Sequence, residues 1–261
     1  MKKAASFALG CKVNQYESEA IAELFAEKGY EIVGIDEEAD VYVINTCTVT
    51  NFGDKKSRQL IRKVKRQNEN AIVAVVGCYA QTAPKELMEI AGVNLVIGTK
   101  DRAQIVEMVE QYDRANGVEN HVSDIMKERV FEPLSIQKLA NRTRAYLKIQ
   151  DGCSQYCSYC IIPYARGPIR SREPQEVVAE VKRLAENGFK EVVLTGIHVA
   201  SYGKDRRDTS LPDILKQVHE VEGIERIRFS SIEPNVVTEE FAQTMAALPK
   251  VCDHFHLSLQ S

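Results

Sequence analysis

The chain has 261 residues, of which 44% are hydrophobic and 27% are charged, and its formal net charge is −3 at pH 7. This composition is typical of a soluble globular protein whose length favours two domains, and it excludes a chain that is basic throughout. No run of 18 or more apolar residues predicts a transmembrane helix. The apolar part of the N-terminus is too short for a signal peptide. Seven cysteines in a chain of cytosolic character favour metal binding or redox chemistry over disulfides.

The first part of the chain alternates short apolar runs with helical patterns. The apolar runs predict strands, which fall at residues 6–10, 41–45, 71–76 and 95–97. The helical patterns fall at residues 15–28, 54–67, 84–90 and 102–112. Continuous apolar strands that alternate with helices form parallel sheets covered on both faces. Residues 1–115 are therefore predicted as a doubly wound α/β domain.

A polar and irregular segment, residues 116–143, is predicted as a linker with a weak strand candidate at 125–131. The alternation then resumes over residues 144–261. Strands are predicted at 144–150, 191–195, 226–231 and 254–260, and helices at 174–187, 211–221 and 239–248. Because the chain ends directly after an apolar strand, we expect that it stops partway through a domain.

Three cysteines far apart in the sequence share one topological position. Cys11, Cys47 and Cys78 each come at or just after the end of a predicted strand, in SFALGC, VYVINTC and AIVAVVGC. The carboxyl ends of parallel strands lie on one edge of the sheet, so we expect the three sulfurs to converge there. Gly10 and Gly77 precede two of them and leave room for a bulky group. A single cysteine is more often a core residue. Three in this position favour an iron–sulfur cluster over zinc, which usually takes four protein ligands in structural sites.

A second trio, Cys153, Cys157 and Cys160, lies in the single loop DGCSQYCSYC after the strand at 144–150. Zinc is the alternative ligand, but a zinc ribbon would need a second CxxC or a pair of histidines. Cys252 stands alone and is interpreted as a core residue. Tyr156 and Tyr159 shield a metal centre or, by default, pack against their neighbours.

The spacing CxxxCxxC resembles the cluster loop of the radical SAM enzymes. Together with GCKVNQYESE, NTCTVTNFGDKKSRQ, VVGCYAQ and CIIPYARGPIRSR, it makes nearly the whole chain resemble the radical SAM methylthiotransferases. GCKVNQYESE and NTCTVTN are most similar to the group that acts on N(6)-threonylcarbamoyladenosine beside the tRNA anticodon. The isopentenyladenosine group usually has Met where this chain has Val13. The group that acts on ribosomal protein S12 usually has Asp where this chain has Glu17.

This resemblance implies a fold and a chemistry. Residues 144–261 would be the first four strands of a partial (β/α) barrel, with the remainder and a C-terminal RNA-binding domain absent from this chain. Cys153, Cys157 and Cys160 would hold a [4Fe–4S] cluster whose fourth iron binds S-adenosylmethionine and releases a 5′-deoxyadenosyl radical. Cys11, Cys47 and Cys78 would hold an auxiliary [4Fe–4S] cluster that carries sulfur. The reaction would attach a methylthio group to carbon 2 of the modified adenosine, with the protein supplying position and isolation.

The resemblance also suggests contacts to S-adenosylmethionine. Thr195 and Gly196 lie where many radical SAM enzymes have a glycine-rich motif, although this chain has TGIH rather than GGE. Ser258 and Gln260 lie where the ribose is often held. His198 lines the site or is a loop histidine in solvent.

Basic residues near the cysteines are the expected contacts to tRNA phosphates. Those in the helix at 54–67 are Lys55, Lys56, Arg58, Arg62, Lys63, Lys65 and Arg66. Those after the cysteine loop are Arg166, Arg170 and Arg172. The alternative is that these charges only solvate the surface.

The resemblance implies tRNA and an electron donor such as flavodoxin or ferredoxin as partners, in the cytoplasm. It gives no reason to expect a membrane contact or an obligate protein partner. Two other functions stay open: methylthiolation of isopentenyladenosine or of ribosomal protein S12, and zinc-dependent RNA binding without catalysis.

Overall fold

The computed structural model describes residues 1–48, 51–136 and 144–259, and of residues 51–54 it describes the backbone alone. The chain divides into two compact units. The first contains Met1–Glu128, Glu132–Leu134 and Gln155–Gly167, and the second contains Arg129–Phe131, Ser135–Ser154 and Pro168–Ser261. Both units are of the α/β class, as predicted.

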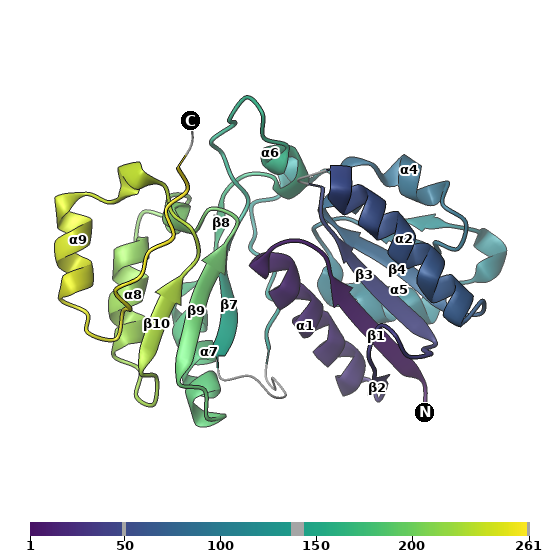
Figure 1. Ribbon diagram of the computed structural model, residues 1–261, viewed down its shortest axis with the longest axis horizontal. Helices are drawn as coiled ribbons and strands as arrows, with labels where there is room; N and C mark the ends of the chain where they lie inside the picture. Colours follow the sequence, from purple (N-terminus) through teal and green to yellow (C-terminus); the bar gives the residue numbers. More distant parts are fainter. Residues whose placement is uncertain (49–50, 137–143, 260–261) are drawn as a thin grey trace. The chain divides into compact units, whose positions relative to one another are not determined.

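The first unit is built on a parallel sheet of six strands in the order β2-β1-β3-β4-β5-β6 (Figure 1). These are β1 (Lys3–Ala8), β2 (Glu31–Ile32), β3 (Val41–Thr46), β4 (Ile72–Gly77), β5 (Leu95–Ile97) and β6 (Glu119–Asn120). The central strands β3 and β4 are buried almost throughout. Their runs of Val and Ile suit a sheet with no solvent face, which confirms the doubly wound fold.

Helices cover both faces of this sheet. They are α1 (Lys12–Glu27), α2 (Asn51–Gln67), α3 (Cys78–Thr82), α4 (Pro84–Met88) and α5 (Ile105–Gln111), with a 3-10 turn, η1, at Arg102–Gln104. Figure 1 shows α2 lying across β3 and β4, where Ile61 and Val64 are fully buried. The opposite face is covered through Ile21 of α1 and Ile105 of α5. The helix predicted at 84–90 is confirmed in its start, because α4 begins at Pro84, whereas the short helix α3 before it was not predicted.

The second unit contains an open, curled sheet in the order β10-β9-β7-β8 (Figure 1). Its strands are β7 (Arg144–Asp151), β8 (Arg170–Ser171), β9 (Glu191–Gly196) and β10 (Arg226–Phe229). Strands β7, β9 and β10 are parallel, and β8 runs antiparallel to β7. The crossover helices are α7 (Pro174–Glu186) and α8 (Leu211–His219), and α9 (Glu239–Ala246) follows β10. This is the predicted first part of a barrel.

Three expectations are corrected. The last predicted strand, at 254–260, forms no ladder in its described part, where Leu257 meets Ile232 in an isolated bridge. Val251, which precedes this range, meets Ile227 of β10 in another isolated bridge. The strand candidate at 125–131 contains a 3-10 turn at Ile125–Lys127 instead. Within the predicted linker 116–143, β6 pairs with β5, so the first sheet extends beyond residue 115. No helix in the described residues is long and apolar enough to cross a membrane.

Candidate functional site

The first cysteine trio lies at the carboxyl edge of the first sheet. Cys47 directly follows β3 and Cys78 directly follows β4, whose last residues Thr46 and Gly77 are register partners. Cys11 follows β1 and is the residue before α1. Since β1, β3 and β4 are neighbours and adjacent strands lie about 4.8 Å apart, the three thiols start from adjacent positions. The predicted placement of the trio on one edge is therefore confirmed.

Two further observations indicate that the thiols lie near one another. A Cβ atom added to Gly10 would lie 2.7 Å from Sγ of Cys47, so the residue before Cys11 contacts the Cys47 side chain. Cys11 is also close enough for its charge to be one of the causes that raise the pKa of Cys78, after burial. The stronger expectation, that all three sulfurs already meet, is not confirmed. Within residues 1–48, 51–136 and 144–259, no three His, Cys, Asp or Glu side chains are arranged to hold a metal ion.

The thiols share polar neighbours that the sequence does not suggest. The amide of Asn14 donates to the Thr46 carbonyl at 2.9 Å, and its Oδ1 lies 3.7 Å from Sγ of Cys11. Nε of Arg166 donates to Sγ of Cys78 at 3.1 Å, and its Nη2 donates to Oδ1 of Asn14 at 2.6 Å. Arg166 is the last residue of α6 (Ile162–Arg166) and is completely buried.

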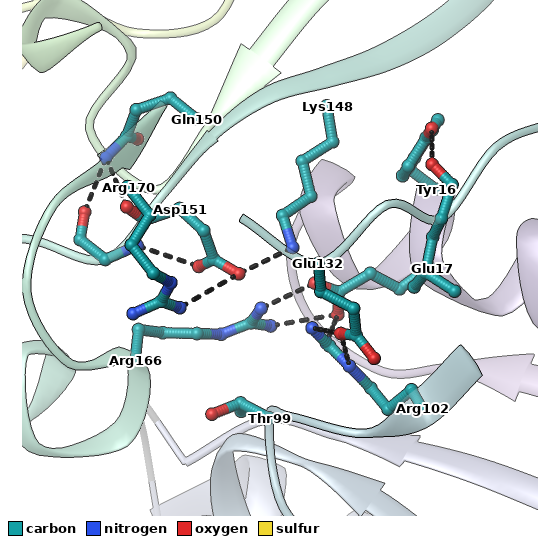
Figure 2. Close-up of polar contacts among 12 residues, drawn as sticks. Tyr16, Glu17, Thr99, Arg102, Glu132, Lys148, Gln150, Asp151, Arg166 and Arg170 are labelled. Carbon is teal, nitrogen blue, oxygen red and sulfur yellow. Dashed lines mark hydrogen bonds and ion pairs between the residues drawn. The ribbon is translucent and has the colours of Figure 1, made fainter. Parts of the chain in front are cut away.

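A buried ion-pair network holds Arg166 in place, as Figure 2 shows. Its Nη1 lies 2.6 Å from Oε1 of Glu17, and Arg102 contacts Oε2 of the same carboxylate at 2.6 Å. Arg102 also forms an ion pair with Glu132 at 2.6 Å. Glu17 and both arginines have no solvent exposure. Buried charges of this kind are tolerated when each one is paired and hydrogen-bonded.

The same surroundings act on the Cys78 thiol. Burial raises the pKa of Cys78 above its usual value, while the charge and hydrogen bond of Arg166 act to lower it. Iron is bound by the thiolate, so a thiol buried among apolar groups alone would be a poor ligand. Arg166 therefore supplies the positive charge that a buried thiolate requires.

The second cysteine trio lies in an irregular loop. Cys153 is buried, Cys160 is partly exposed and Cys157 is exposed, and the amide of Cys160 donates to the carbonyl of Cys157 at 2.9 Å. The loop begins at Gly152, which has a φ of +72° and so turns the chain sharply after β7. Tyr159 is 72% exposed. Tyr156 stacks edge-on with Tyr164 at a centroid distance of 6.2 Å.

In the second unit, polar residues gather after β9 and β10. Thr195 is buried, and Gly196 accommodates Gln150, whose Oε1 would lie 2.7 Å from an added Cβ. His198 is not a loop histidine in solvent, because its Nε2 lies 2.8 Å from Oε2 of Glu233 and its Nδ1 lies 2.6 Å from Oγ of Ser201. These groups come from the ends of adjacent parallel strands, where such sheets bind ligands.

The last two predicted S-adenosylmethionine contacts are on the segment beyond β10. The amide of Ser258 donates to the carbonyl of Ile232 at 2.8 Å, which places this residue beside the segment that follows β10. Gln260 lies outside the described residues.

The prediction that the three arginines after the cysteine loop contact RNA is corrected by their burial. Arg166, Arg170 and Arg172 are at most 3% exposed and face carboxylates of this chain rather than solvent. Arg170 lies 3.6 Å from Asp151, which also forms a 2.5 Å ion pair with Lys148 (Figure 2). Arg172 forms a 2.6 Å ion pair with Glu180. A buried and paired guanidinium has no face left for a phosphate.

The basic residues of α2 remain candidates for phosphate contact. Lys55, Lys56, Arg62, Lys63 and Arg66 are exposed, whereas Arg58 and Lys65 are partly buried. Arg58 donates to the hydroxyl of Tyr79 at 2.8 Å, and Lys65 donates to the carbonyls of Glu69 and Ala71. A groove of about 940 Å³ runs beside this helix. We call it the α2 groove, and it is lined by Phe7, Leu9, Lys56, Gln59, Leu60, Arg62, Lys63, Lys65, Arg66 and Ala91.

The first trio fits an iron–sulfur cluster by the chemistry of its donors. The three ligands offered are thiols on adjacent strand ends, Gly10 leaves the Cys47 sulfur accessible from the Cys11 side, and Arg166 stabilises a thiolate at Cys78. Cys11 is exposed, so its side chain has room to rotate toward the other two. Three ligands leave one iron of a four-iron cluster open for a further ligand.

Sequence reasoning missed the roles of Asn14, Glu17 and Arg166. Asn14 and Glu17 lie three and six residues after Cys11, so helical spacing places them one and two turns along α1. That spacing is a local signal for polar residues directed at the cysteine. Arg166 carries no such signal, because its partner Glu17 is 149 residues away in the sequence.

Two family descriptions match the chain. The family described as "Uncharacterized protein family UPF0004" matches residues 3–98, and the radical SAM superfamily matches residues 147–261. Among solved structures, that of TsrM, a radical S-adenosylmethionine methyltransferase from Kitasatospora setae, has a TM-score of 0.62 at 17% identity. The match covers 95% of this chain and 58% of that one. At this identity the likeness supports the fold alone.

Curated relatives match along nearly the whole chain. The "Threonylcarbamoyladenosine tRNA methylthiotransferase MtaB" of Bacillus subtilis is 50% identical over 100% of this chain and 58% of its own length. The protein of the same name from Aquifex aeolicus is 41% identical over 99% of this chain and 63% of its own length. A "tRNA-2-methylthio-N(6)-dimethylallyladenosine synthase" of Dictyoglomus thermophilum is 35% identical over 97% of this chain and 58% of its length. The chain thus spans about three fifths of the length of these relatives.

Proposed function

The chain belongs to the radical SAM methylthiotransferase family, and from that premise we propose that the protein methylthiolates carbon 2 of N(6)-threonylcarbamoyladenosine in tRNA. The observation that carries this choice of substrate is the 50% identity to the MtaB protein of Bacillus subtilis along the entire chain. The relatives named for dimethylallyladenosine are less similar, at 34–36% identity.

Two sets of thiols would hold the two [4Fe–4S] clusters. Cys153, Cys157 and Cys160 are assigned to the radical SAM cluster from their spacing along the chain. Cys11, Cys47 and Cys78 are assigned to the auxiliary cluster, which the edge of the first sheet supports. When bound, the clusters and S-adenosylmethionine supply the radical and sulfur chemistry, and this chain positions them.

S-adenosylmethionine would bind at the carboxyl ends of β9 and β10. Thr195 and Gly196 would offer backbone groups, since TGIH has no carboxylate of its own. Glu233 supports this assignment, because its carboxylate lies after the neighbouring strand and is fixed by His198. Ser258 and Gln260 remain proposed contacts to the ribose.

The α2 groove is the proposed contact for tRNA phosphates. Five of its ten lining residues are Lys or Arg and none is acidic, in a chain whose net charge is −3. Apolar side chains that line the groove, such as Phe7 and Leu60, would pack against sugar or base. We further propose a cytoplasmic protein that receives its electrons from a flavodoxin or ferredoxin.

The function is tested by mass spectrometry of tRNA nucleosides from cells that lack the gene. We expect the methylthio form of threonylcarbamoyladenosine to disappear and the unmodified precursor to accumulate. The full-length wild-type protein should restore the product, whereas its Cys157→Ala variant should not. Loss of the isopentenyl product instead, with the threonylcarbamoyl product intact, would support the second candidate, methylthiolation of isopentenyladenosine. The relatives named for dimethylallyladenosine are the observation that keeps this candidate open.

Charge reversal in the α2 groove should weaken tRNA binding. Arg62 and Arg66 are exposed, so Arg62→Glu with Arg66→Glu should remove about two phosphate contacts without disturbing the fold. We expect at least a tenfold weaker Kd for tRNA and a slope of log Kd against log salt that is smaller by about 2. Filter binding of the full-length protein over a range of salt measures both quantities. Lys182→Glu, at an exposed position of α7, is the matched control. An unchanged affinity in the double variant would exclude the groove.

A further inference from the structure

We propose that Arg166 is a positioning residue for the auxiliary cluster, which fixes the Cys78 sulfur through an N–H···S hydrogen bond and raises the reduction potential of that cluster. The inference rests on the proposed function, because it assumes that Cys78 is a cluster ligand. It assigns a task to a residue that is not one of the cysteine ligands.

The guanidinium of Arg166 divides its donors between the sulfur and two polar side chains. Nε donates to Sγ of Cys78 at 3.1 Å. On the other side, Nη1 and Nη2 donate to the carboxylate of Glu17 at 2.6 and 3.2 Å, and Nη2 donates to Asn14 at 2.6 Å. The planar fork makes these bonds in fixed relative directions, so the position of the sulfur is defined by Glu17 and Asn14.

The charges around Arg166 suit an anionic ligand at Cys78. Arg102 and Arg166 carry two positive charges, and their partners Glu17 and Glu132 carry two negative charges. Glu17 is shared by both arginines, and Nε of Arg166 is directed at the sulfur. Since Arg166 and Glu17 are completely buried, water does not screen the interaction with Cys78.

Arg166 is also connected to the second cysteine loop. It ends α6, and Cys160 lies six residues before it in the same stretch Gln155–Gly167 of the first unit. A second bond holds this stretch, because Oγ1 of Thr99 donates to the carbonyl of Ala165 at 2.8 Å. The residue that sets the Cys78 sulfur is therefore carried on the segment that contains Cys157 and Cys160.

Hydrogen bonds to ligand sulfurs and nearby positive charge stabilise the reduced form of an iron–sulfur cluster, which carries one more negative charge. Arg166 supplies both effects at one ligand. A side chain that keeps the positive charge but cannot bond to the sulfur and the carboxylate together should lose part of this stabilisation. Lysine is such a side chain, because its single ammonium group lacks the fork.

The experiment uses the full-length protein with Cys153, Cys157 and Cys160 replaced by alanine, so that only the auxiliary cluster assembles. Arg166→Lys in this background should retain iron and sulfide, but its cluster should be harder to reduce. We expect the ratio of reduced to oxidised cluster at a fixed potential to fall at least tenfold, which is about 59 mV for one electron. A redox titration followed by electron paramagnetic resonance measures this shift.

Two buried arginines provide matched controls. Arg102→Lys alters the same network at Glu17 and leaves Arg166 itself unchanged, and Arg172→Lys alters a buried ion pair in the second unit. Both should leave the potential unchanged. An equal shift in Arg102→Lys, or no shift in Arg166→Lys, overturns the inference. If Arg166→Lys does not fold, Arg166→Gln combined with Glu17→Gln removes one charge of each sign and should show the same shift. A parent protein that binds no iron and sulfide overturns the proposed function and the inference together.

Discussion

Replacement of Cys47 by alanine is expected to remove the auxiliary cluster from the full-length protein and to reduce tRNA methylthiolation below detection. Cys47 sits directly after β3, between the strand ends that carry Cys11 and Cys78, so its loss leaves two thiols on either side of a gap. Cleavage of S-adenosylmethionine to 5′-deoxyadenosine should continue, because Cys153, Cys157 and Cys160 are untouched. Iron and sulfide analysis, together with chromatography of the nucleoside products, measures the two effects separately.

The reciprocal variant is Cys157→Ala, which should abolish cleavage of S-adenosylmethionine and retain the auxiliary cluster. Cys252→Ala is the matched control, because Cys252 belongs to neither trio and should change neither quantity. Loss of both clusters in either cysteine variant, with the far-ultraviolet circular dichroism unchanged, would show that the two sites do not assemble independently. Zinc without sulfide in the wild-type protein would favour the non-catalytic RNA-binding alternative.

The edge that carries Cys11, Cys47 and Cys78 could be predicted because its signals are local. Each cysteine comes at or just after the end of a short apolar run, and the alternation with helices indicates parallel strands. In a parallel sheet that combination is sufficient to place all three residues on one edge. The order of β1, β3 and β4 as neighbours, which the prediction did not specify, makes the trio compact.

The environment of Arg166 could not be predicted because its partners are remote. In the sequence, Arg166, Arg170 and Arg172 form a basic run, and such a run usually lies at the surface. Glu17, Asp151 and Glu180 neutralise these three side chains in the interior, and pattern reasoning has no access to those pairs. The prediction was therefore wrong about what the arginines bind. It was right that Arg166 lies close to a cysteine site.

The shortest strands were not predicted, for a different reason. Strands β2, β6 and β8 contain two residues each, which is too few for a period of two to emerge from the sequence. The apolar segment at 254–260 shows the opposite error. Its composition is that of a strand, but its described part forms an isolated bridge between Leu257 and Ile232 instead of a ladder, and composition does not determine register.

Gly10→Ala is expected to abolish binding of the auxiliary cluster although it changes no ligand. Gly10 has a φ of +97°, and a Cβ at this position would lie 2.6 Å from Cβ and 2.7 Å from Sγ of Cys47. Such contacts are far inside van der Waals distance, so Cys47 or the backbone before Cys11 has to move. Displacement of a thiol by even a fraction of an ångström matters, because the bonds from iron to sulfur are of about the same length as the 2.3 Å of Zn–S.

The control for this variant separates crowding from backbone strain. Gly29 has a φ of +85°, and a Cβ added there would meet nothing within 4 Å. Gly29→Ala should therefore cost about 1–2 kcal/mol of stability from the left-handed conformation alone and should bind iron and sulfide as the wild type does. Gly10→Ala should carry the same strain and a further cost of about 1–3 kcal/mol from overpacking. Thermal unfolding and iron content of the two full-length variants, compared after anaerobic reconstitution, test this. Equal iron content in the Gly10→Ala and Gly29→Ala variants would contradict this prediction. It would mean that the Cys47 sulfur does not bind the cluster from its present position beside Gly10.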